Sequence, residues 1–241
     1  DKDWAWMNEQ LGSFECTLVN KSEEFSLLAI QGPKTVETLK SIDLGFEFKD
    51  IEYYSIQHET VTNGQVLMAR TGYTGEDGFE VFGPHQYIKE LWQKLMDANV
   101  TPCGLGARDV LRLEVCYPLY GHELNDDVTP LDSSLKWTVK MNKDKFIGKE
   151  SLESYAPKFR LMKLSLEKGI PRDHYSVVNQ DDKKIGEITS GTMSVELKKG
   201  IALARIDKNL YNSDDQILID IRGKKYPATI NTKPFVTGGH K

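Results

Sequence analysis

Apolar residues in the first part of the chain recur at both strand and helix spacing. Short apolar runs predict three strands, at 26–30, 66–69 and 79–82. Apolar residues at helical spacing predict helices over 85–98 and 104–115, and Pro33 suits the first turn of a further short helix. This part of the chain therefore mixes strands and helices.

From about residue 156 the pattern changes to short β-rich runs with no helix between them. The predicted strands lie at 161–166, 175–178, 184–189, 201–206, 216–221 and 226–230. Residues 179–182 and 222–223 have the composition of hairpin turns, and 189–192 is predicted to form a tight turn. We therefore expect an α+β chain, with a mixed α/β domain at 1–155 followed by a small all-β barrel at 156–241.

Composition places the chain among ordinary globular proteins. Of its 241 residues, 39% are hydrophobic and 28% are charged, which excludes disordered and fibrous classes. No run approaches the ~18 apolar residues that a membrane span needs. The 31 basic and 36 acidic residues give a net charge of −5, which disfavours binding to a phosphate backbone. We therefore expect no membrane and no nucleic-acid partner.

The cysteines and the first residue bear on compartment and completeness. Cys16, Cys103 and Cys116 form no CxxC pair, which favours free thiols in a reducing compartment. The chain begins with Asp1 rather than Met, and no secretory or transit segment is visible. We therefore expect that a leading segment has been removed from it.

A glycine-rich segment at 70–80 is the first candidate for chemistry. Its glycines allow a close approach of the backbone, but no Gly-Lys-Ser/Thr follows, so it is not a Walker phosphate loop. Glu80 shares a strand face with Phe82, because side chains alternate along a strand. A carboxylate there either reaches solvent or has a committed partner, and the residues alone favour solvent.

Arg108 is the second candidate. It lies near the start of a predicted helix, where the macrodipole disfavours a cation, so another interaction must hold it. Its planar guanidinium suits a carboxylate or the edge of a polar heterocycle. A surface arginine paired with Asp109 or Glu114 is equally compatible with the sequence.

A long polar loop at 117–130 contains a histidine and three carboxylates: His122, Glu123, Asp126 and Asp127. Their spacing matches neither HExxH nor an EF-hand, so no metal site is expected. The chain also lacks a GxSxG elbow, which leaves a nucleophilic hydrolase without local support.

Seven motifs together resemble one family, the aminomethyltransferase or T-protein of the glycine cleavage system. They occur in the family's order at 27–33, 70–80, 104–109, 119–124, 146–150, 169–172 and 186–193. One such motif is weak, whereas seven collinear motifs over nearly the whole chain are specific. In this comparison, residues 1–155 resemble the remainder of a folate-binding domain, and 156–241 resemble a C-terminal β-barrel.

The resemblance implies transfer of an aminomethyl group from the dihydrolipoyl arm of the H-protein to tetrahydrofolate. The products are ammonia and 5,10-methylenetetrahydrofolate, tetrahydrofolate is the acceptor substrate, and no metal is implied. Glu80 and Arg108 match the positions that hold the folate, and Tyr73 is expected beside it. A carboxylate can accept a bidentate pair of hydrogen bonds from the pterin amine and ring N–H. The compartment implied is a bacterial cytoplasm, or the mitochondrial matrix in a eukaryote.

Two departures from the family pattern concern activity. The aspartate that orients the folate in the family would lie upstream of Asp1. At the other end, Pro234 and Phe235 are followed by a different sequence, in which His240 is only a loose substitute for a folate contact. We therefore predict that the isolated chain has little or no turnover even if it binds folate.

Three alternatives stay open from the sequence. A folate-binding tRNA-modification accessory protein would carry a cysteine motif where this chain has 145–150, and a folate module of a flavoenzyme would come with GxGxxG. Neither motif is present. The third alternative is a catalytically incomplete folate-binding fragment or paralogue, and tetrahydrofolate titration of the wild type and Glu80→Ala would test it.

Overall fold

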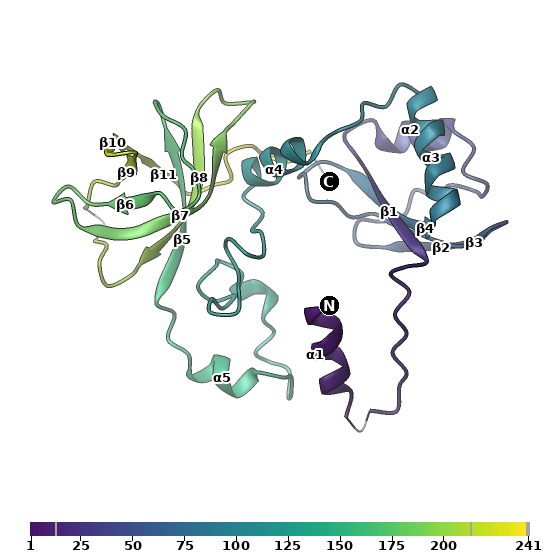
Figure 1. Cartoon of the computed structure of the whole chain (residues 1–241), viewed down its shortest axis with the longest axis horizontal. Coiled ribbons are helices and arrows are strands. Elements are labelled where there is room, and N and C mark those ends of the chain that lie inside the picture. The colour runs from purple at the N-terminus through teal and green to yellow at the C-terminus, as the bar shows by residue number, and fades with distance from the viewer. Residues whose placement is uncertain (13, 213, 240–241) are drawn as a thin grey trace. The chain divides into compact units, whose positions relative to one another are not determined.

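The computed structural model describes residues 1–12, 14–212 and 214–239, which form two units (Figure 1). The first unit contains Asp1–Gly72 and Asp77–Thr101. The second contains Tyr73–Glu76 and the chain from Pro102 onward. The glycine-rich segment 70–80 therefore contributes residues to both units.

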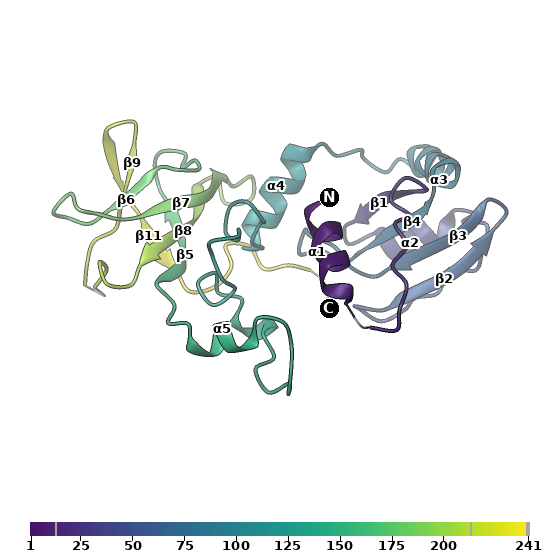
Figure 2. The ribbon, with the colours of Figure 1, turned by 60° about the horizontal axis from the view of Figure 1, so that its bottom comes forward.

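A four-stranded antiparallel sheet with strand order β1-β4-β3-β2 forms the first unit. Its strands are β1 (Phe25–Gln31), β2 (Ile56–Val61), β3 (Gly64–Ala69) and β4 (Gly78–Pro84). Its helices are α1 (Lys2–Leu11), α2 (Thr35–Ser41) and α3 (His85–Asp97), of which α2 and α3 pack on the sheet (Figure 2). The three strands and both helices predicted for this region are confirmed.

Alternation along β4 fixes the two faces of this sheet. Phe79 and Val81 are 0% and 1% exposed and form one core with Leu91 of α3. Burying each such side chain stabilises the fold by about 1.5–3 kcal/mol. Because neighbouring side chains point to opposite faces, Glu80 and Phe82 project from the face that the core does not use.

The second unit contains a curled seven-stranded antiparallel sheet, with order β10-β9-β6-β7-β8-β5-β11 (Figure 2). Its strands are β5 (Phe159–Leu166), β6 (Ser176–Val178), β7 (Lys184–Met193), β8 (Gly200–Asp207), β9 (Leu218–Ile221), β10 (Lys224–Pro227) and β11 (Thr229–Asn231). Helix α4 (Leu105–Glu114) packs on β7 and β8, and η1 (Lys136–Thr138) and α5 (Lys149–Ser154) lie between α4 and the sheet in the chain. A mixed first part and an antiparallel all-β second part confirm the predicted α+β class.

Two sequence predictions for this sheet were wrong. Residues 189–192 do not form a turn but continue β7, whose register shifts between Ile188 and Ser190. A β-bulge of this kind bends a strand without ending it. The run at 226–230 is two short strands rather than one, because β10 pairs with β9 whereas β11 pairs with β5.

Four elements were missed by the hydrophobic pattern: α1, β2, η1 and α5. The strand β2 alternates largely exposed with partly buried positions, as expected for an edge strand that contributes little to the core. Helices α1 and α5 contain no buried residue. Such elements leave little periodic signal in the sequence.

The domain boundary expected near residue 156 stays a prediction. The chain passes from the first unit to the second between Thr101 and Pro102. Helix α4, which follows, packs on strands of the second unit. None of the helices in the described residues is long and apolar enough to span a bilayer.

Candidate functional site

Glu80 in the first unit is half-buried on the sheet face opposite the core. Its Oε2 accepts a hydrogen bond from the Thr71 hydroxyl at 2.6 Å. In the sheet register it lies between Ala29 of β1 and Ala69 of β3, whose small side chains leave space on both sides of the carboxylate. The carboxylate therefore has one partner in its own unit and retains capacity to accept further hydrogen bonds.

Gln31 is the group that the glycine-rich segment approaches closely. Its side-chain amide donates to the carbonyl oxygens of Thr71 and Phe79, at 3.1 and 3.3 Å. A Cβ at Gly72 would lie 1.9 Å from the Gln31 Oε1, and one at Gly78 would lie 2.5 Å from the Ile30 carbonyl oxygen. The backbone of Ile30 thus requires a glycine at 78, whereas at 72 the close group is the end of the Gln31 side chain.

An ion pair links Arg70 and Asp77 within the glycine-rich segment. Arg70 donates from Nε and Nη2 to the two carboxylate oxygens of Asp77, at 2.9 and 2.7 Å. It also donates from Nη1 to Asp50 at 2.7 Å. The hydrogen bonds that Arg70 donates to Asp77 raise the pKa of Arg70 above its ordinary value. The segment that carries Thr71 is therefore anchored at both ends, which orients the hydroxyl that meets Glu80.

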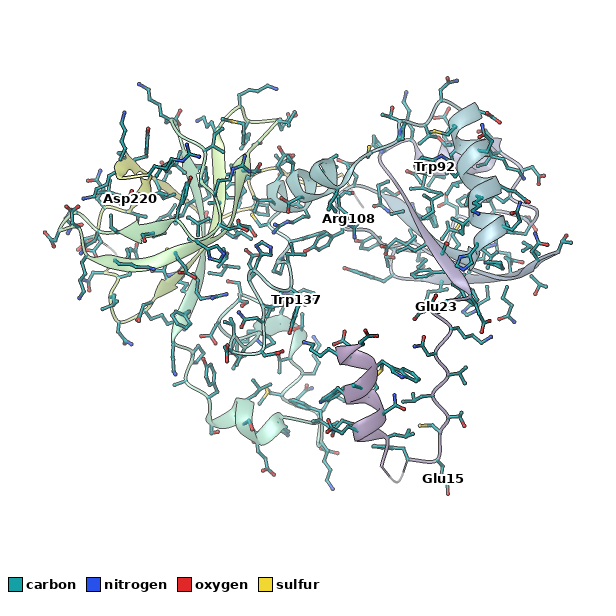
Figure 3. All side chains as sticks on the ribbon, viewed as in Figure 1. Glu15, Glu23, Trp92, Arg108, Trp137 and Asp220 are labelled. Atoms are coloured by element: carbon teal, nitrogen blue, oxygen red, sulfur yellow. The ribbon has the colours of Figure 1, made fainter. Side chains whose placement is uncertain are left out.

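Arg108 lies exposed in the first turn of α4 in the second unit (Figure 3). Its guanidinium carbon is 5.2 Å from the centroid of the Tyr73 ring, which is a cation–π contact. Asp109 pairs with Arg112 instead, and Glu114 accepts from Ser194. The alternative of Arg108 paired with Asp109 or Glu114 is therefore wrong.

Tyr73 is fixed by its own contacts in the second unit. Its hydroxyl donates to the Pro118 carbonyl oxygen, and its ring lies 5.6 Å from the Tyr117 ring. Burial raises the pKa of Tyr73 above its ordinary value, so the phenol is neutral at physiological pH. The Tyr73 ring therefore supports the Arg108 guanidinium, whose N–H groups make no hydrogen bond or ion pair among the described residues.

The polar loop at 117–130 is held by contacts within the loop and with other segments of the second unit. Glu123 is fully buried and pairs with Arg112, and His122 lies 2.9 Å from Asp173. Tyr120 donates to Asp126 at 2.6 Å. Within 1–12, 14–212 and 214–239, no three His, Cys, Asp or Glu side chains are grouped as metal ligands.

His240, the remaining predicted site residue, lies outside the described residues. The aspartate expected upstream of Asp1 is not part of the chain. Sequence reasoning missed Thr71 and Pro118, which contact Glu80 and Tyr73, and Arg112, which pairs with Glu123. Thr71 lies in the same glycine-rich segment as Glu80. That shared segment was the one signal in the sequence that could have indicated Thr71.

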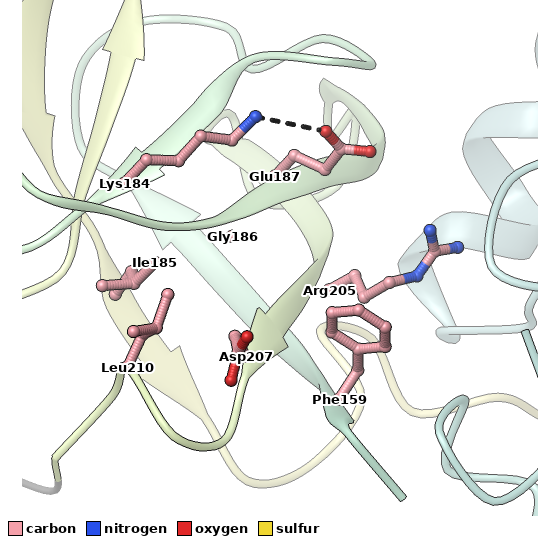
Figure 4. Close-up of a pocket in the computed structure, with 8 residues that line it drawn as sticks. All are labelled: Phe159, Lys184, Ile185, Gly186, Glu187, Arg205, Asp207 and Leu210. Atoms are coloured by element: carbon pink, nitrogen blue, oxygen red, sulfur yellow. Dashed lines mark hydrogen bonds and ion pairs between the residues drawn. The ribbon is translucent and has the colours of Figure 1, made fainter.

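A pocket of about 380 Å³ lies in the curled sheet of the second unit (Figure 4). Its walls carry both charge signs, and Lys184 pairs with Glu187 at 3.4 Å. The lining residues are Phe159, Lys184, Ile185, Gly186, Glu187, Arg205, Asp207 and Leu210. None of the predicted site residues lines this pocket.

Two family models match the chain in order, and they define its class as a glycine cleavage T-protein. The GCVT N-terminal domain matches residues 1–143. The glycine cleavage T-protein C-terminal barrel domain matches residues 160–237. Together they match most of the chain.

Individual relatives agree with the family models. An aminomethyltransferase of Thermosipho melanesiensis is 42% identical, covering 100% of this chain and 67% of the relative. One of Desulfitobacterium hafniense is 43% identical, covering 95% of this chain and 65% of the relative. The crystal structure of glycine cleavage system aminomethyltransferase T from Bartonella henselae is similar with a TM-score of 0.87 and 28% identity, covering 99% of this chain and 66% of that chain.

The chain belongs to the aminomethyltransferase family, the T-proteins of the glycine cleavage system. The predicted family and enzyme class are confirmed, and a non-catalytic remnant is not favoured. The chain spans about two thirds of the length of these relatives.

Proposed function

We propose that this chain supplies the folate-contacting part of an aminomethyltransferase. The reaction transfers the aminomethyl group on the dihydrolipoyl arm of the H-protein to tetrahydrofolate, and it yields ammonia and 5,10-methylenetetrahydrofolate. The observation that carries the proposal is the ordered match of both T-protein family models along the chain.

Glu80 is proposed to bind the pterin edge of tetrahydrofolate. The pterin presents an amine and a ring N–H side by side, and a carboxylate accepts both as a bidentate pair. The half-buried position of Glu80 between two alanines and the fixed hydroxyl of Thr71 support this role. Hydrogen bonds to a charged group contribute about 1.5–3 kcal/mol each, so loss of Glu80 has a measurable cost.

Arg108 is proposed to donate to oxygen or nitrogen acceptors of the folate. The geometry that supports this is the stacking of its guanidinium on Tyr73 while its N–H groups have no acceptor among the described residues. Stacking restricts the side chain, so less conformational entropy is lost when a ligand binds. Tyr73 is proposed to lie beside the folate through this contact.

The chemistry needs positioning more than acid–base groups. The dihydrolipoyl thiolate and ammonia both leave the transferred carbon as two folate nitrogens bond to it, and the protein contributes orientation and charge stabilisation.

The implied partners are the lipoylated H-protein and tetrahydrofolate, and the reaction as written uses no metal. A cytoplasmic location is proposed from the bacterial relatives. A domain boundary near residue 156 is also proposed, and it is supported by the family models, which end at 143 and begin at 160.

Calorimetric titration of tetrahydrofolate into the chain tests the folate site. Glu80→Ala should raise the Kd at least about tenfold, which corresponds to about 1.4 kcal/mol. Glu59→Ala is the matched control, because Glu59 lies in the same sheet and pairs with Lys49 at 3.2 Å. Equal Kd values for the two variants, or no binding by the wild type, would contradict the proposal.

A further inference from the structure

We propose that a buried ion pair between Arg112 and Glu123, here called the buried pair, positions Arg108 and Tyr73 for the ligand. The proposal rests on the function proposed above and adds two positioning residues to it. Neither residue of the buried pair is expected to touch the folate itself.

The buried pair is inaccessible and fully hydrogen-bonded. Glu123 is 0% exposed, and its Oε2 lies 3.3 Å from the Arg112 Nη1. The Thr189 hydroxyl donates to Oε1 at 2.5 Å, and the Leu119 backbone N–H donates to Oε2 at 2.8 Å. A buried charge is costly unless it is paired and hydrogen-bonded, so this geometry is needed for both side chains to stay charged.

One set of contacts leads from the buried pair to Tyr73. The arginine donates from Nη1 to the Tyr117 carbonyl oxygen at 3.4 Å, and the glutamate accepts from the Leu119 N–H. Pro118 lies between these two residues, and its carbonyl oxygen accepts the Tyr73 hydroxyl. The acceptor of the phenol is therefore held on both sides by the buried pair.

A second set of contacts leads to Arg108. The Arg112 Nε and Nη2 both donate to the Asp109 Oδ1, at 2.8 and 2.6 Å. Asp109 follows Arg108 directly in α4. Nη2 also donates to the Ser190 hydroxyl of β7 at 3.0 Å, which ties the helix to the sheet. Both partners of the cation–π contact are thus held by one buried ion pair.

Glu114 provides a matched control for a merely structural role. Glu114 is also buried, at 5% exposed, and lies in α4, the helix that carries Arg112. Its carboxylate accepts from the Ser194 hydroxyl at 2.6 Å and from the Glu196 N–H at 3.2 Å. Among the described residues its side chain makes no hydrogen bond or ion pair with residues 117–119, Tyr73 or Arg108.

The test compares Glu123→Gln with Glu114→Gln in the full chain. Calorimetric titration with 5-formyltetrahydrofolate, a stable reduced folate, gives the Kd, and hydrogen exchange of the 117–124 segment reports how firmly the turn is held. We expect Glu123→Gln to raise the Kd about tenfold and to speed exchange, whereas Glu114→Gln changes the Kd less than about twofold. Equal effects of the two variants on both readouts overturn the proposal.

A readout without folate separates this inference from the proposed function. If the wild type does not bind folate, the proposed function fails, and the positioning is read from the Tyr73 phenol by ultraviolet titration against Tyr73→Phe. The charge of Glu123 itself raises the pKa of Tyr73, so this titration uses Thr189→Val, which keeps the charge and removes one donor to the carboxylate. Loosening should lower the raised pKa of Tyr73 towards its ordinary value in Thr189→Val but not in Glu114→Gln. An unchanged phenol titration in Thr189→Val overturns the inference. If Glu123→Gln does not fold, Thr189→Val replaces it in the folate assay.

Discussion

Asp132 hydrogen-bonds both to the polar loop at 117–130 and to the start of β5 in the seven-stranded sheet. It is 2% exposed, and its Oδ1 accepts the backbone N–H groups of Lys158 and Phe159, both at 2.9 Å. Its Oδ2 accepts the hydroxyls of Thr129 and Tyr155, at 2.7 and 2.8 Å. Removing the charge should therefore weaken four hydrogen bonds at once.

The magnitude follows from the change in bond type. In Asp132→Asn the amide oxygen can still accept the two backbone N–H groups, but bonds to a charged acceptor contribute about 1 kcal/mol more each than neutral ones. We expect a loss of about 2–3 kcal/mol in the free energy of unfolding. Asp132→Ala leaves the buried N–H groups without an acceptor and should cost about 3–5 kcal/mol.

The pH dependence of this loss has a definite sign. Burial alone would raise the pKa of Asp132, but the hydrogen bonds from Phe159, Thr129, Tyr155 and Lys158 outweigh it and lower the pKa below its ordinary value. The stabilisation is therefore complete above the unfolded pKa of about 3.9 and is lost as pH falls through the lower folded pKa.

Urea unfolding followed by circular dichroism, near neutral pH and at about pH 3, measures both effects. The difference between the wild type and Asp132→Asn should shrink at the lower pH. Asp127→Asn is the control, because Asp127 is an exposed carboxylate in the same loop, and it should change stability by less than about 0.5 kcal/mol. A difference that is equal at both pH values would refute the reasoning.

Two further predictions concern the glycine-rich segment. Gly78→Ala should destabilise the chain by about 1–3 kcal/mol in thermal unfolding, because its Cβ meets the backbone oxygen of Ile30 at 2.5 Å, and an unchanged Tm contradicts this. The destabilisation caused by Gly72→Ala should be relieved in a Gln31→Ala background, because the group that its Cβ meets at 1.9 Å is a side chain; equal losses in both backgrounds exclude that account.

Local patterns in the sequence determined much of the fold. The alternation at 79–82 placed Phe79 and Val81 in the core and Glu80 on the other face, as the structure has it. The apolar spacing at 85–98 predicted α3 nearly to its ends. These predictions succeeded because side-chain period and burial are local properties of a strand or helix.

Only the tertiary structure decided the partners of the polar residues. The Arg108 guanidinium stacks on the ring of Tyr73, 35 positions earlier in the chain, and does not pair with its neighbour Asp109. Residues 189–192 continue a strand by pairing with β8. The side chains of Thr189 and Ser190 bond to Glu123 and Arg112, which lie 66 and 78 positions away in the chain. Periodicity carries no information about such contacts, since a buried polar group is satisfied by whichever segment the fold brings to it.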